Sequence, residues 1–444
     1  MLETRFGPGA RLAASWAYLI GRVFASGSRI FIGSLPAAVI LFGFQATPDG
    51  GEKIGAVQIQ LAVAAMTVIG VIYTLAGGIR SVIWADVVQA FVYLGTAVGA
   101  IVFLLWLIPA DLSQIIAALR EPAPGAPSKL NLIDIGINPP GSGKPFIDLS
   151  DGYTLITTFT GFALITLASH GTDQDLVQRM LTCRDAKQSA KSLISGILIG
   201  IPAVAIFLVI GLLLWVFYNR PDLVESAHTP PRDKTFLRFI VSEIPPGLAG
   251  LMMAGLFAAG LSSVNSTLNA MSSTFLSDVY RHMFPRRAGD ARHELWVGRV
   301  GVVVAGIAVG GFAALCTIWY DPERTTLIDF ALGVMSFAYA GLLAVFLVAL
   351  FTKRGNTASA ITALIVGFVA VLVQQSFVRH WFAGFLPAGP AEDLRKLNIA
   401  FPWQLVFATT LATAVCLIGR PRRTTVEPAP AAAPSPPVPA GKAP

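Results

Sequence analysis

The chain has 444 residues, of which 54% are hydrophobic and 13% are charged, and its mean hydropathy is +0.67. This composition excludes an ordinary soluble domain, because apolar runs of about 20 residues recur and each is long enough to cross a bilayer. The net charge of +7 does not indicate nucleic-acid binding, since the basic residues lie in short segments between the apolar runs. The composition predicts an all-α, polytopic membrane protein.

In chain order we count about ten predicted spans, each near the length that a bilayer requires. They lie at residues 12–43, 56–76, 80–108, 153–178, 190–218, 246–280, 295–317, 327–351, 357–378 and 401–419. Arg80 is placed in a tight turn between the second and third spans. Every second linker is basic and the alternate linkers are acidic or balanced, which predicts a multi-pass protein of the cell membrane with both ends of the chain in the cytoplasm.

Two segments fall outside the predicted membrane region. Residues 110–152 are rich in proline and glycine and are expected to form an external loop with room for a short helix. Residues 424–444 form a proline- and alanine-rich tail that cannot bury a core, so we expect it to be disordered in the cytoplasm. Residues 1–423 are then one transmembrane domain. The sequence contains no phosphate-binding glycine loop, metal-ligand cluster or supported nucleophile–base pair, which favours a non-enzyme without a cofactor.

Charged residues inside the predicted spans are candidates for function, because a charge is costly at membrane depth. Arg29 lies near the middle of the first span and Arg22 lies two turns earlier. The charge of Arg29 requires either a structural ion pair or an anionic ligand. For Arg22 a third possibility is that its side chain extends to the inner membrane surface. Asp86 in the third span either interacts with a helix N-terminus or supplies charge to a cation site or release path.

The fourth span ends in a polar stretch that begins at Gly171 and continues through Asp173, Gln174 and Asp175. A glycine followed by carboxylates predicts a break in the helix at membrane depth, where unwound backbone can contact a solute. The alternative is that the helix simply reaches the cytoplasmic interface, where Arg179 belongs.

The sixth span carries an unusual number of small hydroxyl side chains. Ala259, Ser262, Ser263 and Ser266 fall on one helical face, because they lie at offsets 0, 3, 4 and 7. This stripe is typical of close packing between membrane helices. It is also suited to a sodium ion, which prefers neutral hydroxyl and carbonyl oxygens. The spacing leaves both interpretations open.

Three stretches resemble signatures of the sodium:solute symporter family: GGIRSVIWADVVQ (77–89), SHGTDQDLVQRMLTCRDAKQSAKS (169–192) and AAGLSSVNSTLNAMSSTFLSDVY (258–280). The resemblance runs in order from about residue 1 to 380. It implies the LeuT-type architecture of inverted helical repeats, with sodium and solute near the middle of the membrane. The implied function is a symporter that uses sodium as the coupling ion to import a small organic solute.

The resemblance also assigns expected roles to residues. It implies a sodium site with a backbone carbonyl from Ala259 and hydroxyls from Ser262 and Ser263. A second sodium site, present in some bacterial members, implies a carboxylate from Asp86 together with side-chain oxygens from Ser262, Asn265 and Ser266. Asn265 lies at a position where family members with this second site typically have a serine. In other members, the aspartate at the position of Asp86 helps sodium to leave the site toward the cytoplasm.

For the solute, the resemblance places Asp173 where sugar carriers have a contacting polar residue, and Gln174 is its neighbour in the same polar stretch. An arginine that holds the carboxylate in a sialic-acid carrier implies this role for Arg29 or Arg22. The opening MLETRFGPGARL resembles the cytoplasmic linker that follows the first helices of family members. We therefore expect two helices of the first repeat to be missing and coupled transport to be impaired. The alternatives are an inactive truncated symporter, a solute sensor without transport, and a passive channel.

Overall fold

The computed structural model describes residues 1–46, 52–123, 126–131, 133–138, 145–224, 234–285, 289–322 and 325–420. Within these ranges the chain is helical apart from connecting segments, an isolated bridge between Ile137 and Ile147, and two short antiparallel strands, β1 (Gln45–Ala46) and β2 (Glu52–Lys53). The tail expected at 424–444 lies outside the described residues.

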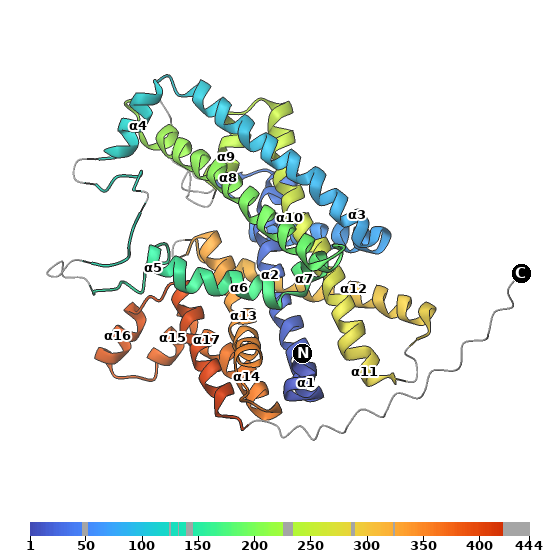
Figure 1. Ribbon diagram of the computed structural model, residues 1–444. Coiled ribbons are helices and arrows are strands. Elements are labelled where there is room, and N and C mark those ends of the chain that lie inside the picture. The colour runs from blue at the N-terminus through green and yellow to red at the C-terminus, as the bar shows by residue number, and fades with distance from the viewer. Residues whose placement is uncertain are drawn as a thin grey trace, which may run out of the picture.

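The first half of the chain forms α1 (Leu2–Phe6), α2 (Pro8–Phe42), α3 (Ala56–Leu107), α4 (Leu112–Arg120), α5 (Leu155–Thr157), the π-helical turn η1 (Thr158–Phe162), α6 (Ala163–Thr172), α7 (Gln174–Leu181) and α8 (Ala186–Asn219). The second half forms α9 (Thr235–Ser242), α10 (Pro246–Thr274), the π-helical turn η2 (Phe275–Tyr280), α11 (Arg281–Met283), α12 (Ala291–Trp319), α13 (Leu327–Phe351), α14 (Thr357–Val373), α15 (Ser376–Ala383), α16 (Ala388–Lys396) and α17 (Phe401–Ile418). Figure 1 shows these helices as one bundle with α2 running through its middle.

Eight helical segments of the described chain are long and apolar enough to cross a membrane. They are α2, two parts of α3 (Ala56–Gly77 and Ile83–Leu107), α8, the run Pro246–Met283, α12, α13 and α17. Two more predicted spans correspond to α14, which is shorter, and to the segment from α5 to α6, which η1 interrupts. Each of the ten predicted spans therefore has a helical counterpart, and the chain is a multi-pass membrane protein.

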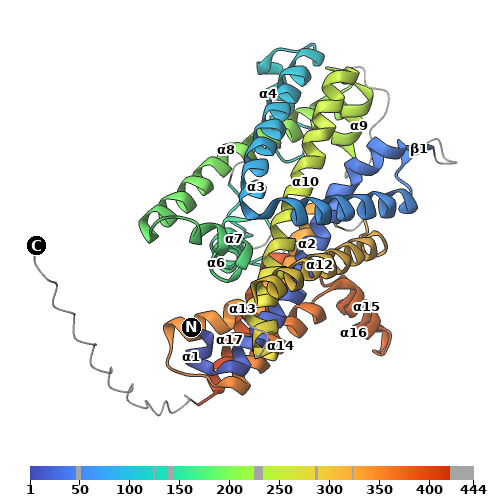
Figure 2. The same ribbon diagram turned by 90° about the vertical axis from the view of Figure 1, so that its right-hand side faces the viewer.

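The tight turn expected at Arg80 is wrong. The backbone from Ala56 to Leu107 is one continuous helix, α3, whose two arms run in different directions (Figure 2). Asp86 therefore lies in the interior of a helix, where the amide groups are already paired along the helix. The interpretation of Asp86 as the partner of a helix N-terminus is wrong for the same reason.

Close contacts between helix backbones bring α2 against α10 and α13. A side-chain carbon added at Gly33 of α2 would lie only 3.0 Å from the Cα of Gly260 in α10, and one added at Gly21 would lie 2.4 Å from the Cβ of Ala338 in α13. Small residues permit such close approach in membrane bundles. Gly260 thus supplies the small-residue packing surface of α10 toward α2, while Ser262 and Ser266 make contacts elsewhere.

The helix break expected after Gly171 is confirmed. α6 ends at Thr172, and Asp173 has an extended backbone with φ −87° and ψ 111°. The Asp173 carboxylate caps the next helix by accepting a hydrogen bond of 3.1 Å from the backbone N–H of Asp175. The break places the side chains of Asp173 and Asp175 in the interior of the bundle rather than along an unbroken helix.

Candidate functional site

A buried arginine on α2 connects α2 to the start of α7 and to α10. Arg22 is 4% exposed, and its Nη1 donates a hydrogen bond of 2.5 Å to Oδ2 of Asp173. Its Nη2 donates to Oδ2 of Asp175 and, at 3.1 Å, to Oγ1 of Thr267. Two carboxylates thus pair with one guanidinium. Such pairing is needed because an unpaired charge in the interior of a protein is strongly destabilising.

Further hydrogen bonds hold this cluster in place. The hydroxyl of Tyr339 on α13 donates to Oδ2 of Asp173 at 3.0 Å, and the hydroxyls of Ser26 and Thr267 lie 3.0 Å apart. Asp173 therefore receives donors from α2, α13 and the backbone of α7. Because its carboxylate and the Arg22 guanidinium are committed to each other, Arg22 is a structural ion pair in this conformation.

Arg29 lies two turns further along α2 and differs from Arg22 in its surroundings. Its half-buried side chain makes one hydrogen bond within the described residues, from Nη2 to Sδ of Met335 at 3.2 Å. A thioether sulfur is a weak acceptor. No carboxylate of the described chain lies within ion-pair distance of Arg29. Of the two candidate arginines, Arg29 is the one without a carboxylate at ion-pair distance among the described residues.

A second cluster joins α3, α7 and α10 around Arg179. The Nη2 of Arg179 lies 3.0 Å from Oδ2 of Asp86 and also donates to Oγ of Ser266. Ser262 donates to Oδ1 of Asp86 at 2.5 Å. Three residues expected to form the second sodium site, Asp86, Ser262 and Ser266, are thus brought together, with a guanidinium among them.

The two clusters meet at Asp175. Its Oδ2 accepts from Arg22, and its Oδ1 lies 3.8 Å from Nε of Arg179. The joined cluster contains three carboxylates, from Asp86, Asp173 and Asp175, and two guanidiniums. It therefore carries one net negative charge when all these groups are ionised, which favours the binding of a monovalent cation.

Within the described chain, the other expected site residues are not joined to these clusters by side-chain hydrogen bonds. Asn265 is 1% exposed, and its Oδ1 has no partner among the described residues and lies toward Gly70 in the first arm of α3. Ala259, Ser263 and Gln174 are half-buried, and the Ser263 and Gln174 side chains make no hydrogen bond within the described chain. Nor does that part of the chain contain a group of three or more His, Cys, Asp or Glu side chains placed to hold a metal ion.

Sequence reasoning missed two parts of this site. It placed Arg179 at the membrane interface, whereas its guanidinium reaches Asp86 and Ser266. The spacing of Asp175 and Arg179, four residues apart in α7, was the available signal that both face the same side. Tyr339 gave no signal, because one tyrosine in an apolar span has no pattern that distinguishes it from a packing residue.

Comparison with known proteins places these features in context. A model of the sodium:solute symporter family matches residues 52–367. The sodium/sialic acid symporter SiaT of Proteus mirabilis is 27% identical over 87% of this chain and 71% of its own length. The human sodium/iodide cotransporter is 25% identical over 84% of this chain, and the sodium/glucose cotransporter of Vibrio parahaemolyticus is 25% identical over 82%.

The chain spans only 52% of the length of the human relative and 64% of that of the Vibrio relative. Among solved structures, a substrate-bound, outward-open Na⁺-coupled sialic acid symporter with a novel Na⁺ site is similar, with a TM-score of 0.66 and 25% identity. The likeness covers 94% of this chain and 75% of that one. The helical arrangement is therefore that of the LeuT-type fold, as the resemblance implied.

Proposed function

The chain belongs to the sodium:solute symporter family, and from this premise we propose that it is a sodium-coupled secondary transporter that imports a small organic solute by alternating access. The main support is that Asp86, Ser262 and Ser266 lie together around the Arg179 guanidinium, where α3, α7 and α10 contact one another. The alternating charge of the linkers supports a place in the cell membrane with both termini cytoplasmic.

In this proposal Asp86, Ser262 and Ser266 supply oxygen ligands to a sodium ion. Carboxylate and hydroxyl oxygens suit a hard cation, and the net negative charge of the joined cluster favours its entry. Arg179 is a tethered cation that pairs with Asp86 when sodium is not bound, so the two positive charges compete for one carboxylate. This competition couples sodium binding to a conformational change, because Arg179 of α7 must release Asp86 when sodium binds.

A sodium site formed by the Ala259 carbonyl and the hydroxyls of Ser262 and Ser263 stays part of the proposal. Its support is the half-burial of these positions and the unpaired hydroxyl of Ser263 among the described residues. Because Ser262 belongs to both sets of ligands, occupation of one sodium site affects the other. Within the described residues, Asn265 makes no hydrogen bond with Asp86, and its Oδ1, which has no partner there, lies toward Gly70 in the first arm of α3.

For the solute, we assign Arg29 as the group that binds an anionic part, such as a carboxylate. A guanidinium at this depth without a carboxylate partner is costly, and an arriving anion would form charge-assisted hydrogen bonds with it. Asp173 is occupied by Arg22 and Tyr339, so its role is to hold α2, α7 and α13 together rather than to contact the solute. Gln174, next to the break, remains a candidate for a polar contact.

The transport cycle follows from these roles. External sodium binds at Asp86 and the α10 hydroxyls and raises the affinity for the solute through a coupling free energy. The repeats then rock around the site and expose both ligands to the inside. Arg179, which lies four residues after Asp175, returns to Asp86 as sodium leaves. No covalent chemistry is needed, and the sodium gradient drives accumulation.

Uptake into proteoliposomes tests the proposal. We expect an inward sodium gradient, but not an equal potassium gradient, to drive accumulation of at least one member of a panel of small organic anions, at the reduced rate expected for impaired coupling. Flux that ignores the sodium gradient would indicate a passive channel, and binding without flux would indicate a sensor or an inactive symporter. Either result would contradict sodium-coupled transport by this chain.

A further inference from the structure

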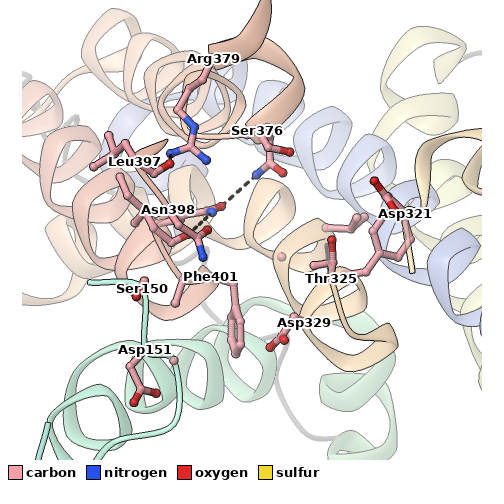
Figure 3. A pocket seen from close by; sticks show the side chains of 18 of the residues that line it. Ser150, Asp151, Asp321, Thr325, Asp329, Ser376, Arg379, Leu397, Asn398 and Phe401 are labelled. Carbon is pink, nitrogen blue, oxygen red and sulfur yellow. Dashed lines mark hydrogen bonds between the residues drawn. The ribbon is translucent and has the colours of Figure 1, made fainter. Parts of the chain in front are cut away.

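A large cavity lies outside the α2–α7–α10 clusters. It measures about 1110 Å³ and lies between the segment before α5, the connection from α12 to α13, and the segments around α15 and α17 (Figure 3). All three of these connections belong to linkers that the charge alternation places outside the membrane on the same side. The cavity is therefore positioned as an outer vestibule of the bundle.

Within the described residues, one charged group of this cavity, the guanidinium of Arg379, has hydrogen-bond donors without an acceptor. Arg379 of α15 is 7% exposed and lines the cavity, and its Nη1 donates to the backbone carbonyl of Leu397. Within the described chain its Nε has no hydrogen-bond partner, and no carboxylate lies within 4 Å of its guanidinium. Burying an uncompensated charge is expensive, so an anion that satisfies Arg379 would be bound favourably.

Four carboxylates line the same cavity, those of Asp148, Asp151, Asp321 and Asp329, and each keeps its charge but already has a partner. Asp329 accepts a hydrogen bond of 2.6 Å from the hydroxyl of Tyr153, and Asp151 accepts one of 2.9 Å from the backbone of Tyr153. Asp148 accepts from the backbone and hydroxyl of Ser150. In Figure 3, Asp151 and Asp329 lie well away from Arg379. Among the described residues, these carboxylates have partners, whereas the Nε–Nη2 edge of Arg379 has no hydrogen-bond acceptor.

The geometry of Arg379 indicates the class of ligand. Because Leu397 takes Nη1, the opposite edge of the guanidinium, formed by Nε and Nη2, has no acceptor among the described residues. Two parallel N–H donors on one edge match the two oxygens of a planar carboxylate. The neighbouring amides of the cavity wall are held by their own hydrogen bonds: Gln375 donates to the side-chain oxygen of Gln404 at 2.9 Å, and Gln404 donates to the backbone carbonyl of Ile399 at 2.7 Å.

We propose that this cavity binds the carboxylate of a small organic anion at Arg379. Binding at Arg379 does not depend on the deeper sodium and solute sites. The further role of Arg379 as the first binding site of a solute that then moves to Arg29 rests on the proposed transport function. The site is distinct from the α2–α10 region, because it is built from α15, the Leu397–Phe401 segment and the cavity wall.

Protection of an introduced cysteine tests this binding with acetate as the probe. Ser376 is exposed, lines the cavity and lies three residues before Arg379 on the same helical face. A Ser376→Cys chain would also carry Cys183→Ser, because Cys183 is partly exposed, and Arg29→Gln, so that acetate cannot act through Arg29. The rate of modification by neutral methyl methanethiosulfonate is measured in acetate and in chloride at equal ionic strength.

We expect acetate to slow modification, by about tenfold at ten times its Kd, because about a tenth of the cavities then remain empty. Arg379→Gln should remove the protection, and Arg379→Lys should retain only part of it, because an ammonium lacks the paired donors of a guanidinium. The lysine variant keeps the test valid if loss of the Leu397 contact prevents the glutamine variant from folding.

Two results would overturn the proposal. The first is equal protection by acetate in chains with and without Arg379, or none in either. The second is protection by inorganic phosphate but not by acetate, which would replace the carboxylate as the ligand class. Because every chain in the experiment carries Arg29→Gln and none needs to transport, failure here leaves the proposed transport function unaffected.

Discussion

Removing Arg179 should increase the affinity for sodium. In the wild-type chain sodium must displace the Arg179 guanidinium from Asp86 and Ser266, and Arg179→Gln removes that competitor. An exposed ion pair contributes up to about 1 kcal/mol and a buried charge-assisted hydrogen bond about 1.5–3 kcal/mol. The Arg179 side chain is 39% exposed and that of Asp86 is 16% exposed, so we take about 1–2 kcal/mol, a factor of about 5–30 in affinity.

The assay is the sodium concentration that gives half of the maximal rise in the thermal unfolding midpoint of the purified chain. Arg11→Gln is the matched control, since Arg11 forms a similarly exposed ion pair of 2.8 Å with Asp278, remote from Asp86. Arg11→Gln should leave this half-maximal sodium concentration unchanged, whereas Arg179→Gln should lower it. A half-maximal sodium concentration that rises or stays constant in Arg179→Gln would refute the competition between Arg179 and sodium.

Three further predictions follow from the same contacts. Arg29→Gln should weaken anionic solutes about 10- to 100-fold in uptake competition, since charge-assisted hydrogen bonds contribute about 1.5–3 kcal/mol; unchanged affinity would remove Arg29 from the solute site. Arg22→Gln should lower the free energy of unfolding by about 3–5 kcal/mol, because it leaves buried carboxylates unpaired, whereas Arg281→Gln, at an exposed pair, should change far less. Gly367→Ala should lower the unfolding midpoint, because its Cβ would lie 2.5 Å from the Gly341 backbone, while Gly311→Ala meets open space and should not.

The spans and the break at Asp173 could be predicted because both depend on local sequence. A membrane span requires a run of apolar residues, and a glycine closely followed by carboxylates favours a helix break at membrane depth. The continuity of α3 could not be predicted in the same way. Arg80 is polar enough to suggest a turn, but the backbone stays helical from Ala56 to Leu107, and the two arms of this helix run in different directions (Figure 2).

The candidate site was predictable only in part. Asp86, Ser262 and Ser266 were identified as possible ligands, and the structure brings them together. Their actual partner, Arg179, could not be assigned, because the guanidinium of a long side chain reaches a different helix from the one that carries it. The commitment of Arg22 to Asp173 depends likewise on the packing of α2 against α7, which residue spacing does not determine.

The central claim is that Asp86 and the α10 hydroxyls bind sodium. The most direct test is thermal unfolding of the purified chain in sodium chloride and in potassium chloride, for the wild type and for Asp86→Asn, which keeps the shape of the side chain and removes its charge. We expect sodium, but not potassium, to raise the wild-type midpoint in a concentration-dependent manner, because a ligand that binds only the folded state stabilises it, and we expect Asp86→Asn to lose this response. Equal effects of the two cations, no response to sodium, or a full response in Asp86→Asn would contradict the claim.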